Sequence, residues 1–258
     1  MDDVVLGTDW ARQWRDLVAA RDAALGPRDE PYWDDRSTRY AVSLSGQDEP
    51  FLRFIAPWLA PHKTLIDVGA GVGRHAVPLA SGLRQVIAVE PARGMRAAIP
   101  RRANLTVVPQ RWPGSGELAA DLVICVHSLY TVADVVPFLR ALDRAATERV
   151  FVVLRDAPSG HPAEILTGRL PEPLLRHAFL VLREMGIAPE VTLYSYRASY
   201  RFAAIDVALA DAAKRGGPTW DAEHGRAFLR ERLRMADDGL LEFDCGEMVA
   251  GILHWAPT

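Results

Sequence analysis

The chain has 258 residues, of which 49% are hydrophobic and 24% are charged, the balance of an ordinary globular domain. A net charge of −3 argues against nucleic acid as a partner, because no overall basic field would attract phosphates. Two cysteines, no Cys/His cluster, no secretory leader and no apolar run of bilayer length together predict a cytoplasmic protein that binds neither a metal nor a membrane.

Residues 1–60 are expected to form a helical segment that lies over the rest of the chain as a lid. The apolar residues within 9–25 recur at helical spacing, and Gly26-Pro27 ends that helix. Further helices are expected over residues 32–44 and 49–59.

Residues 61–258 are expected to form the main domain, which opens with short apolar runs that alternate with helical segments. Continuous apolar strands in such an alternation indicate a parallel sheet that is buried on both faces. The expected strands cover residues 64–68, 85–89, 105–108, 121–126 and 149–154, and the expected helices cover residues 75–81, 93–102 and 135–146.

The stretch 157–240 is too elaborate for a simple connection, and we interpret it as containing an insertion that shapes a substrate pocket. Its patterns predict a strand over 191–200 and helices over 173–185, 202–213 and 221–236. Residues 240–243 and 248–255 are expected to be two antiparallel strands that close the sheet.

The most informative segment is LIDVGAGVGR at residues 65–74, which ends the first expected strand and opens a helix. Glycines there allow a tight turn close to a ligand, and the helix that follows offers free N–H groups. A dinucleotide fingerprint would need a third glycine where Arg74 stands, and the Gly-Lys-Ser/Thr ending of a P-loop is missing. Asp67, two residues before Gly69, would repel a pyrophosphate but would tolerate a cationic ligand.

Glu90 closes the second expected strand. A carboxylate at that place can accept two hydrogen bonds from a ribose diol, each contributing about 1.5–3 kcal/mol. The glycine loop and Glu90 together therefore predict a ligand that contains ribose.

Residues 65–74 resemble motif I of class I S-adenosylmethionine-dependent methyltransferases of the small-molecule type, in which an apolar strand leads into Asp-x-Gly-x-Gly-x-Gly. Residues 86–95, 105–112 and 121–130 are similar to the next motif and to the third and fourth strand regions of that family. The resemblance implies an α/β fold with a Rossmann-like, doubly wound, seven-stranded sheet whose last strand is antiparallel. An N-terminal helical lid and a C-terminal helical insertion would complete it.

The resemblance also implies how S-adenosyl-L-methionine and its product S-adenosyl-L-homocysteine are bound. The backbone of residues 69–71 would pass the methionine part and the ribose, Asp67 would orient the amino group, and Glu90 would hold the ribose hydroxyls. Gln110, where the family often has an acid, could accept a bond from the adenine amino group. The expected cofactor contacts are Asp67, Gly69, Ala70, Gly71, Glu90, Pro91, Met95, Gln110, Arg111, Trp112, Val126 and His127.

The implied reaction is an in-line displacement that moves a methyl group to O, N or C of a small-molecule acceptor, and only a protonated nucleophile needs a general base. The loop after the fourth strand borders the ligand crevice of such a sheet, so His127 and Tyr130 are the candidate catalytic residues. The candidate substrate contacts are Trp33, Arg36 and Tyr40 on adjacent helical turns, and His161 after the fifth strand.

The sequence leaves other functions open. An RNA or protein methyltransferase is disfavoured by the net charge and by the tetrapeptide at 127–130, where many enzymes that modify planar nitrogens carry Asn/Asp-Pro-Pro-aromatic. A non-catalytic regulator that binds S-adenosylmethionine would need the same cofactor residues. A nicotinamide dehydrogenase is disfavoured by Asp67 and Arg74. The protein is expected to be a monomer or a homodimer.

Overall fold

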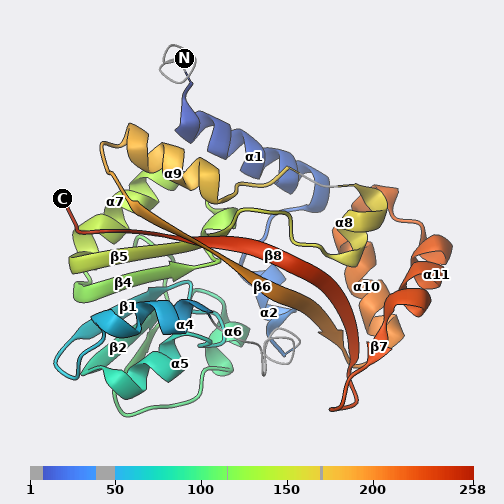
Figure 1. Ribbon diagram of the computed structural model, residues 1–258, viewed down its shortest axis with the longest axis horizontal. Coiled ribbons are helices and arrows are strands. Elements are labelled where there is room, and N and C mark those ends of the chain that lie inside the picture. Colours follow the sequence, from blue (N-terminus) through green and yellow to red (C-terminus); the bar gives the residue numbers. More distant parts are fainter. Residues whose placement is uncertain (1–7, 39–49, 115, 169–170) are drawn as a thin grey trace.

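The structure is a computed structural model that describes residues 8–38, 50–114, 116–168 and 171–258. An eight-stranded sheet runs through its centre in the order β3-β2-β1-β4-β5-β8-β6, and the short strand β7 pairs with β8 beside this path (Figure 1). The strands are β1 (Thr64–Val68), β2 (Gln85–Val89), β3 (Leu105–Val108), β4 (Ala120–Val126), β5 (Ala146–Arg155), β6 (Glu190–Phe202), β7 (Arg234–Met235) and β8 (Leu241–Trp255).

The first five strands are parallel, and β8 runs antiparallel to both of its neighbours, β5 and β6. The doubly wound sheet with an antiparallel closing strand is therefore confirmed. The parallel strands coincide with the predicted apolar runs to within three residues at each end. The central strands β1, β4 and β5 are largely buried on both faces, so their sequences carry a nearly continuous apolar signal, whereas the edge strand β3 is partly exposed. The two-residue strand β7 was not predicted.

Helices cover both faces of this sheet (Figure 1). On one face α1 (Trp10–Leu25), α7 (Val135–Ala145) and α9 (Leu175–Glu184) pack against alternate strand residues such as Ile66 and Val68. On the other face α4 (Pro50–Ile55) and α5 (Ala76–Leu79) pack against the intervening residues, such as Leu65. This alternation follows from the two-residue period of a strand.

The N-terminal helix α1 is anchored to the loop that follows β4. Asp9 caps it by accepting a hydrogen bond from the backbone of Arg12 at 2.7 Å. Trp14, fully buried, donates from Nε1 to the carbonyl of Val132 at 2.7 Å, and the buried Arg21 donates to the carbonyl of Tyr130. Trp14 and Arg21 thus hold α1 against residues 130–132, part of which lines the candidate site.

Several helix boundaries differ from the expected ones. Helix α2 (Glu30–Asp34) starts two residues early because Asp29 caps it, and a turn at Asp35 and Arg36 ends it, so the single helix predicted over 32–44 is wrong at this point. Residues 39–44 lie outside the described residues. Helix α6 (Arg93–Ala97) is half the predicted length. Short 3₁₀ turns are η1 (Ala56–Trp58), η2 (Ala80–Gly82), η3 (Leu129–Thr131) and η4 (Gly217–Thr219). Over the described ranges, no helix combines the length and apolarity that crossing a membrane requires.

The long strands β6 and β8 leave the main sheet together as a two-stranded ribbon (Figure 1). The prediction of two separate strands after residue 240 is wrong, because β8 continues through Gly246, whose positive φ of 75° accommodates a bulge opposite Ala198 and Ser199. Helices α8 (Pro162–Thr167), α10 (Ile205–Gly216) and α11 (Ala222–Arg232) lie at the far end of the ribbon and build a second small core around Phe202 and Phe243.

Candidate active site

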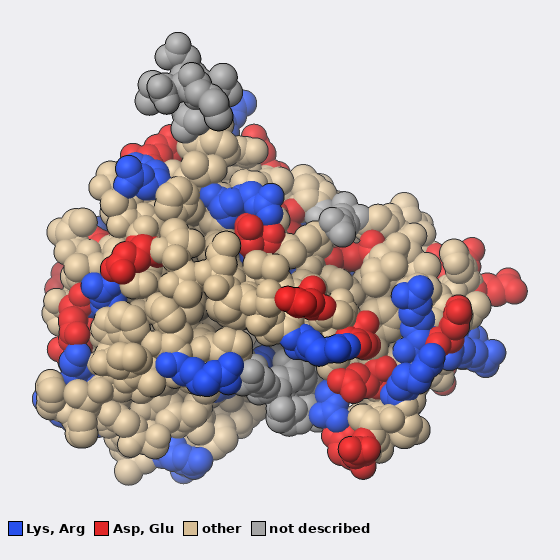
Figure 2. All heavy atoms as spheres, in the orientation of Figure 1, with Lys and Arg blue, Asp and Glu red and all other residues tan. Residues whose placement is uncertain are grey.

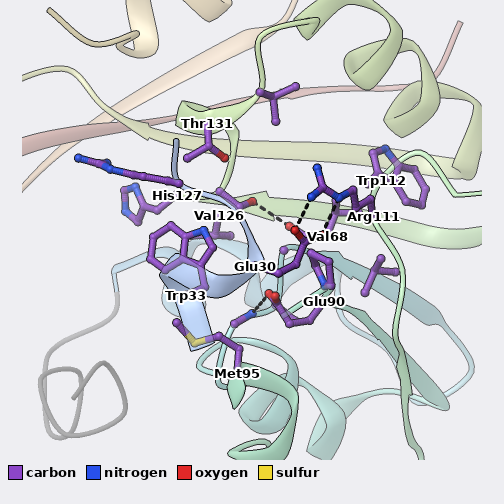
Figure 3. Close-up of a pocket in the computed structure, with 18 of the residues that line it drawn as sticks. Glu30, Trp33, Val68, Glu90, Met95, Arg111, Trp112, Val126, His127 and Thr131 are labelled. Carbon is purple, nitrogen blue, oxygen red and sulfur yellow. Dashed lines mark hydrogen bonds and ion pairs between the residues drawn. The ribbon is translucent and has the colours of Figure 1, made fainter. Parts of the chain in front are cut away.

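A cavity of about 430 Å³ lies at the carboxyl ends of β1, β2 and β4 (Figure 3). The N-terminal segment crosses over it, so residues that are far apart in the chain form its walls. The lining residues are Arg28, Asp29, Glu30, Trp33, Val68, Gly69, Ala70, Gly71, Val72, Arg74, His75, Val89, Glu90, Pro91, Met95, Gln110, Arg111, Trp112, Val126, His127, Ser128, Thr131, Val132, Ala133, Asp134 and Phe138.

The glycine loop turns sharply at the end of β1. The backbone N–H groups of Gly69 and Ala70 both donate to the carbonyl of Val89, at 2.9 and 3.1 Å. Gly69 has a φ of 74°, and a Cβ there would lie 2.4 Å from the Cβ of Ser128. Gly71 has a φ of 58°, but a Cβ would enter open space. Glycine is therefore required at 69 by conformation and packing, and at 71 by conformation alone.

Glu90 joins this loop to the end of β2. Its Oε2 accepts from Gly71 N at 2.9 Å and its Oε1 accepts from Ala92 N at 2.8 Å. Burial raises the pKa of Glu90, and the two backbone bonds oppose that rise. Each carboxylate oxygen keeps a second lone pair, so the group can still accept bonds from two hydroxyls. This arrangement fits the ribose of S-adenosylmethionine.

Asp67 lies beneath the loop rather than in the cavity wall. It is 1% exposed, and its Oδ2 accepts from the backbone N–H of Ala76 at 3.1 Å. Burial raises its pKa to about 6, against the opposing effects of His75 and of the Ala76 bond. The bond to Ala76 holds the start of α5 in place, and Asp67 is not among the residues that line the cavity.

Pro91, Met95, Gln110 and Trp112 also belong to the wall of the cavity. The Nε1 of Trp112 is buried without a hydrogen-bond partner among the described residues. A buried donor without a partner is costly, so an acceptor atom from a bound ligand would relieve it. These side chains fit the adenine of the cofactor that the resemblance implies.

The segment around α2, residues 28–37, covers the cavity and is bonded to the loops after β2 and β3; we call it the cover. Arg111, after β3, forms a bidentate ion pair with Glu30 on α2 (Figure 3). Asp34, at the end of α2, accepts from the backbone N–H of Gly94 at 2.6 Å. A Cβ on Gly94 would approach the Oγ of Ser37 to 2.8 Å, so a glycine allows this close approach. In Figure 3, Trp33 lies above Met95 and beside His127.

The loop after β4 forms another part of the cavity wall, with Val126, His127 and Thr131. His127 has a φ of 55°, a conformation that is strained for a non-glycine residue and is often associated with functional sites. Its backbone N–H donates to Val153, and its Nδ1 lies 3.0 Å from the hydroxyl of Tyr130. Burial, with Arg155 nearby, lowers the pKa of His127 to about 3.

The other expected acceptor residues lie elsewhere. Tyr130 is 6% exposed and sits behind His127. His161 is fully buried, with its Nε2 2.9 Å from Asp211, so it does not face the cavity. Arg36 stacks on the ring of Tyr32 at 3.7 Å, and Tyr40 lies outside the described residues. Of the four expected substrate contacts, Trp33 lines the cavity.

Eleven of the twelve expected cofactor contacts line this cavity, Asp67 being the exception. The sequence did not point to Arg28, Glu30 or Arg74 as wall residues, nor to the segment 131–138. Asp29 before Pro31 was a usable signal, because a helix cap there would have placed residues 28–30 at the helix entry.

A parallel sheet in this strand order, with a glycine loop after β1 that is bonded to an acid after β2, is the arrangement of an S-adenosylmethionine-binding α/β domain. Residues 32–187, more than half of the chain, match the family described as a methyltransferase domain, and the protein belongs to that family. It is an S-adenosylmethionine-dependent methyltransferase. No curated protein sequence matches the chain.

Solved structures share the fold at low sequence identity. A candidate methyltransferase from Bacillus halodurans C-125 has a TM-score of 0.53 at 14% identity, covering 80% of this chain and 99% of that one. YcgJ from Bacillus subtilis has a TM-score of 0.50 at 14% identity, covering 79% and 96%. A candidate type II methyltransferase from Anaeromyxobacter dehalogenans has a TM-score of 0.50 at 16% identity, covering 81% and 96%. These likenesses establish the fold alone.

Proposed function

We propose that this methyltransferase transfers a methyl group to an oxygen, nitrogen or carbon atom of a small-molecule acceptor. The observation that carries the proposal is the cover over the cavity, where Glu30 pairs with Arg111 and Asp34 bonds to Gly94. A small molecule can be enclosed beneath this cover, whereas a macromolecular acceptor would have to displace it.

Residues 1–60, of which Arg28, Asp29, Glu30 and Trp33 lie in the cavity wall, act as a lid in this proposal. The proposal also keeps a substrate-shaping insertion within the segment 157–240, although none of its described residues lies in that wall. When bound, S-adenosylmethionine would supply a methyl group on a sulfonium, so that a lone pair of the acceptor could bond to the methyl carbon as the carbon–sulfur bond breaks and S-adenosylhomocysteine leaves. Glu90 and the glycine loop hold the cofactor, and the cavity walls exclude water and align the acceptor.

The charge pattern supports a small acceptor over RNA. Basic and acidic side chains are interspersed over the face in Figure 2, including the part formed by α10 and α11. The ion pairs Lys214–Asp35 and Arg226–Asp206 belong to this mixture. Such a surface offers a polyanion little net attraction.

The test has two stages. Calorimetric titration with S-adenosylmethionine, with NAD as the control ligand, is expected to show micromolar binding of the former alone. The protein is then incubated with methyl-labelled S-adenosylmethionine and a cell extract separated into small-molecule, RNA and protein fractions. Label is expected in the small-molecule fraction, with Glu90→Ala as the binding-deficient control.

Label in the RNA or protein fraction would overturn the small-molecule proposal. Binding without label in any fraction would favour a non-catalytic regulator.

A further inference from the structure

A chain of polar contacts runs from the protein interior to the wall of the cavity. Glu172 accepts from the guanidinium of Arg155 at 2.9 Å. The backbone N–H of Arg155 donates to the hydroxyl of Tyr130 at 2.7 Å, and its Nε donates to the same oxygen at 3.4 Å. The hydroxyl of Tyr130 then lies 3.0 Å from Nδ1 of His127. The last residue of this chain, His127, lines the cavity (Figure 3).

The proton on the Tyr130 hydroxyl can be located by counting donors. A phenol oxygen has two lone pairs and one proton. Arg155 supplies two N–H groups to this oxygen, and both groups can only donate. The proton of Tyr130 therefore needs an acceptor, and among the described residues Nδ1 of His127 is the one within reach.

We propose that Tyr130, oriented by Arg155, fixes His127 as the neutral tautomer with its proton on Nε2, so that His127 presents a hydrogen-bond donor to the cavity instead of a base. If Nδ1 carried the proton, three donors would point at one oxygen and the buried Tyr130 hydroxyl would have no acceptor. Tyr130 and Arg155 are positioning residues in this scheme, because they act through His127.

The placement of Nε2 agrees with this role. Nδ1 faces the buried hydroxyl, and Nε2, on the other side of the ring, makes no hydrogen bond to any residue in the described ranges. The backbone of His127 is left-handed, and its N–H donates to the carbonyl of Val153 at 2.9 Å. The contact between Nδ1 and the hydroxyl of Tyr130 orients the ring.

The surroundings keep the imidazole neutral. Burial contributes most, and the positive charge of Arg155 behind the ring, with His75 and Arg74 from the segment after the glycine loop, also lowers the pKa of His127. A histidine that stays neutral across the physiological range is a weak base but a constant donor.

The donor restricts what can bind next to it. An Nε2–H donates only to a partner with a free lone pair, such as a carbonyl, carboxylate or phenolate oxygen, and it disfavours an ammonium group. The acceptor is therefore expected to place such an oxygen against His127. This assignment of the substrate class rests on the proposed function, whereas the tautomer rests on the contacts alone.

The tautomer can be measured without cofactor or acceptor. Long-range ¹H–¹⁵N NMR of protein labelled at histidine distinguishes a protonated Nε2 from a protonated Nδ1, and His127→Asn assigns the signal because asparagine tolerates a positive φ. We expect the Nε2–H pattern, unchanged from pH 5 to pH 8. A proton on Nδ1, or a doubly protonated ring at pH 7, would overturn the proposal.

Variants separate the positioning role from a general structural one. Tyr130→Phe is expected to give a mixture of both tautomers, while Tyr194→Phe, a tyrosine on β6 outside this chain of contacts, should leave the spectrum of His127 unchanged. A pure Nε2–H pattern in Tyr130→Phe would show that Tyr130 does not set the tautomer.

In the labelling assay, His127→Gln, which keeps an amide donor, should retain the pH profile of the wild-type protein. Loss of an acidic limb with a midpoint above pH 5 in His127→Gln would identify His127 as a base and contradict the donor role. A failure of methyl transfer in every fraction would count against the proposed function while leaving the NMR result intact.

Discussion

The backbone N–H of Gly71 donates to Oε2 of Glu90 at 2.9 Å, which joins the glycine loop after β1 to the acid after β2. Because β1 and β2 are adjacent and parallel, their carboxyl ends meet at one edge of the sheet. The bond holds Glu90 in position before a ligand arrives, so the carboxylate need not be ordered on binding. Preorganisation of this kind reduces the entropic cost of binding.

Replacing Glu90 with alanine should weaken binding of S-adenosylhomocysteine by roughly tenfold or more, because about 1.5–3 kcal/mol of charge-assisted hydrogen bonding is lost. Calorimetric titration measures the change. Glu223→Ala, on the surface of α11, is the matched control and should bind normally. Equal affinities for wild type and Glu90→Ala would rule out contact with the ribose.

Substitution of the two loop glycines should lower the free energy of unfolding by different amounts. Gly69→Ala places a Cβ 2.4 Å from Ser128 and should lower the free energy of unfolding by several kcal/mol, roughly 1–2 from φ and about 1–3 from overpacking. Gly71→Ala has the φ cost alone, so its loss should be roughly 1–2 kcal/mol. Denaturant unfolding of both variants compares them, and equal losses would show that Ser128 yields without cost.

The bond between Asp34 and Gly94 should govern how long a ligand stays beneath the cover. Asp34→Ala removes a charge-assisted bond of 2.6 Å, so dissociation of S-adenosylhomocysteine should become about tenfold faster. The neighbouring Asp35 pairs with Lys214 on the surface, and Asp35→Ala should change the rate by less than about threefold. Stopped-flow fluorescence measures both rates. An unaltered rate in Asp34→Ala would show that the bond between Asp34 and Gly94 does not limit ligand dissociation.

Asp67 should make stability fall as pH rises. Its pKa is about 6 in the folded protein and about 3.9 in an unfolded chain, so the folded state holds more protons between these values. Its contribution is therefore fully present below pH 4 and is lost as pH rises through 6. Relative to Asp67→Asn, the wild-type protein should lose roughly 2–3 kcal/mol between pH 4 and pH 7.

Urea unfolding of both proteins across that range isolates the contribution of Asp67, because the other titrating groups are shared and cancel. Parallel curves would mean that the carboxylate titrates normally in the folded state.

The sequence by itself determined the parallel part of the fold and eleven of the residues that line the candidate site. The strands β1, β2 and β3 have the predicted boundaries because each is a short, mostly apolar run that is followed by a glycine, an acid or a proline. Glu90 and the glycine loop could be predicted for a related reason, because a tight turn of glycines and an acid at the end of a strand are both features of neighbouring residues in the chain.

Only the tertiary structure decided which residues meet across the cavity. Glu30 and Arg111 are far apart in the chain and pair only once α2 has docked. Similarly, His161 was expected to face the substrate, yet β6 and α10 enclose it beside Tyr200 and Asp211. Such contacts depend on how separate elements pack, and no local sequence pattern encodes them. The same holds for the tautomer of His127, which follows from a hydroxyl three residues away and an arginine on the neighbouring strand.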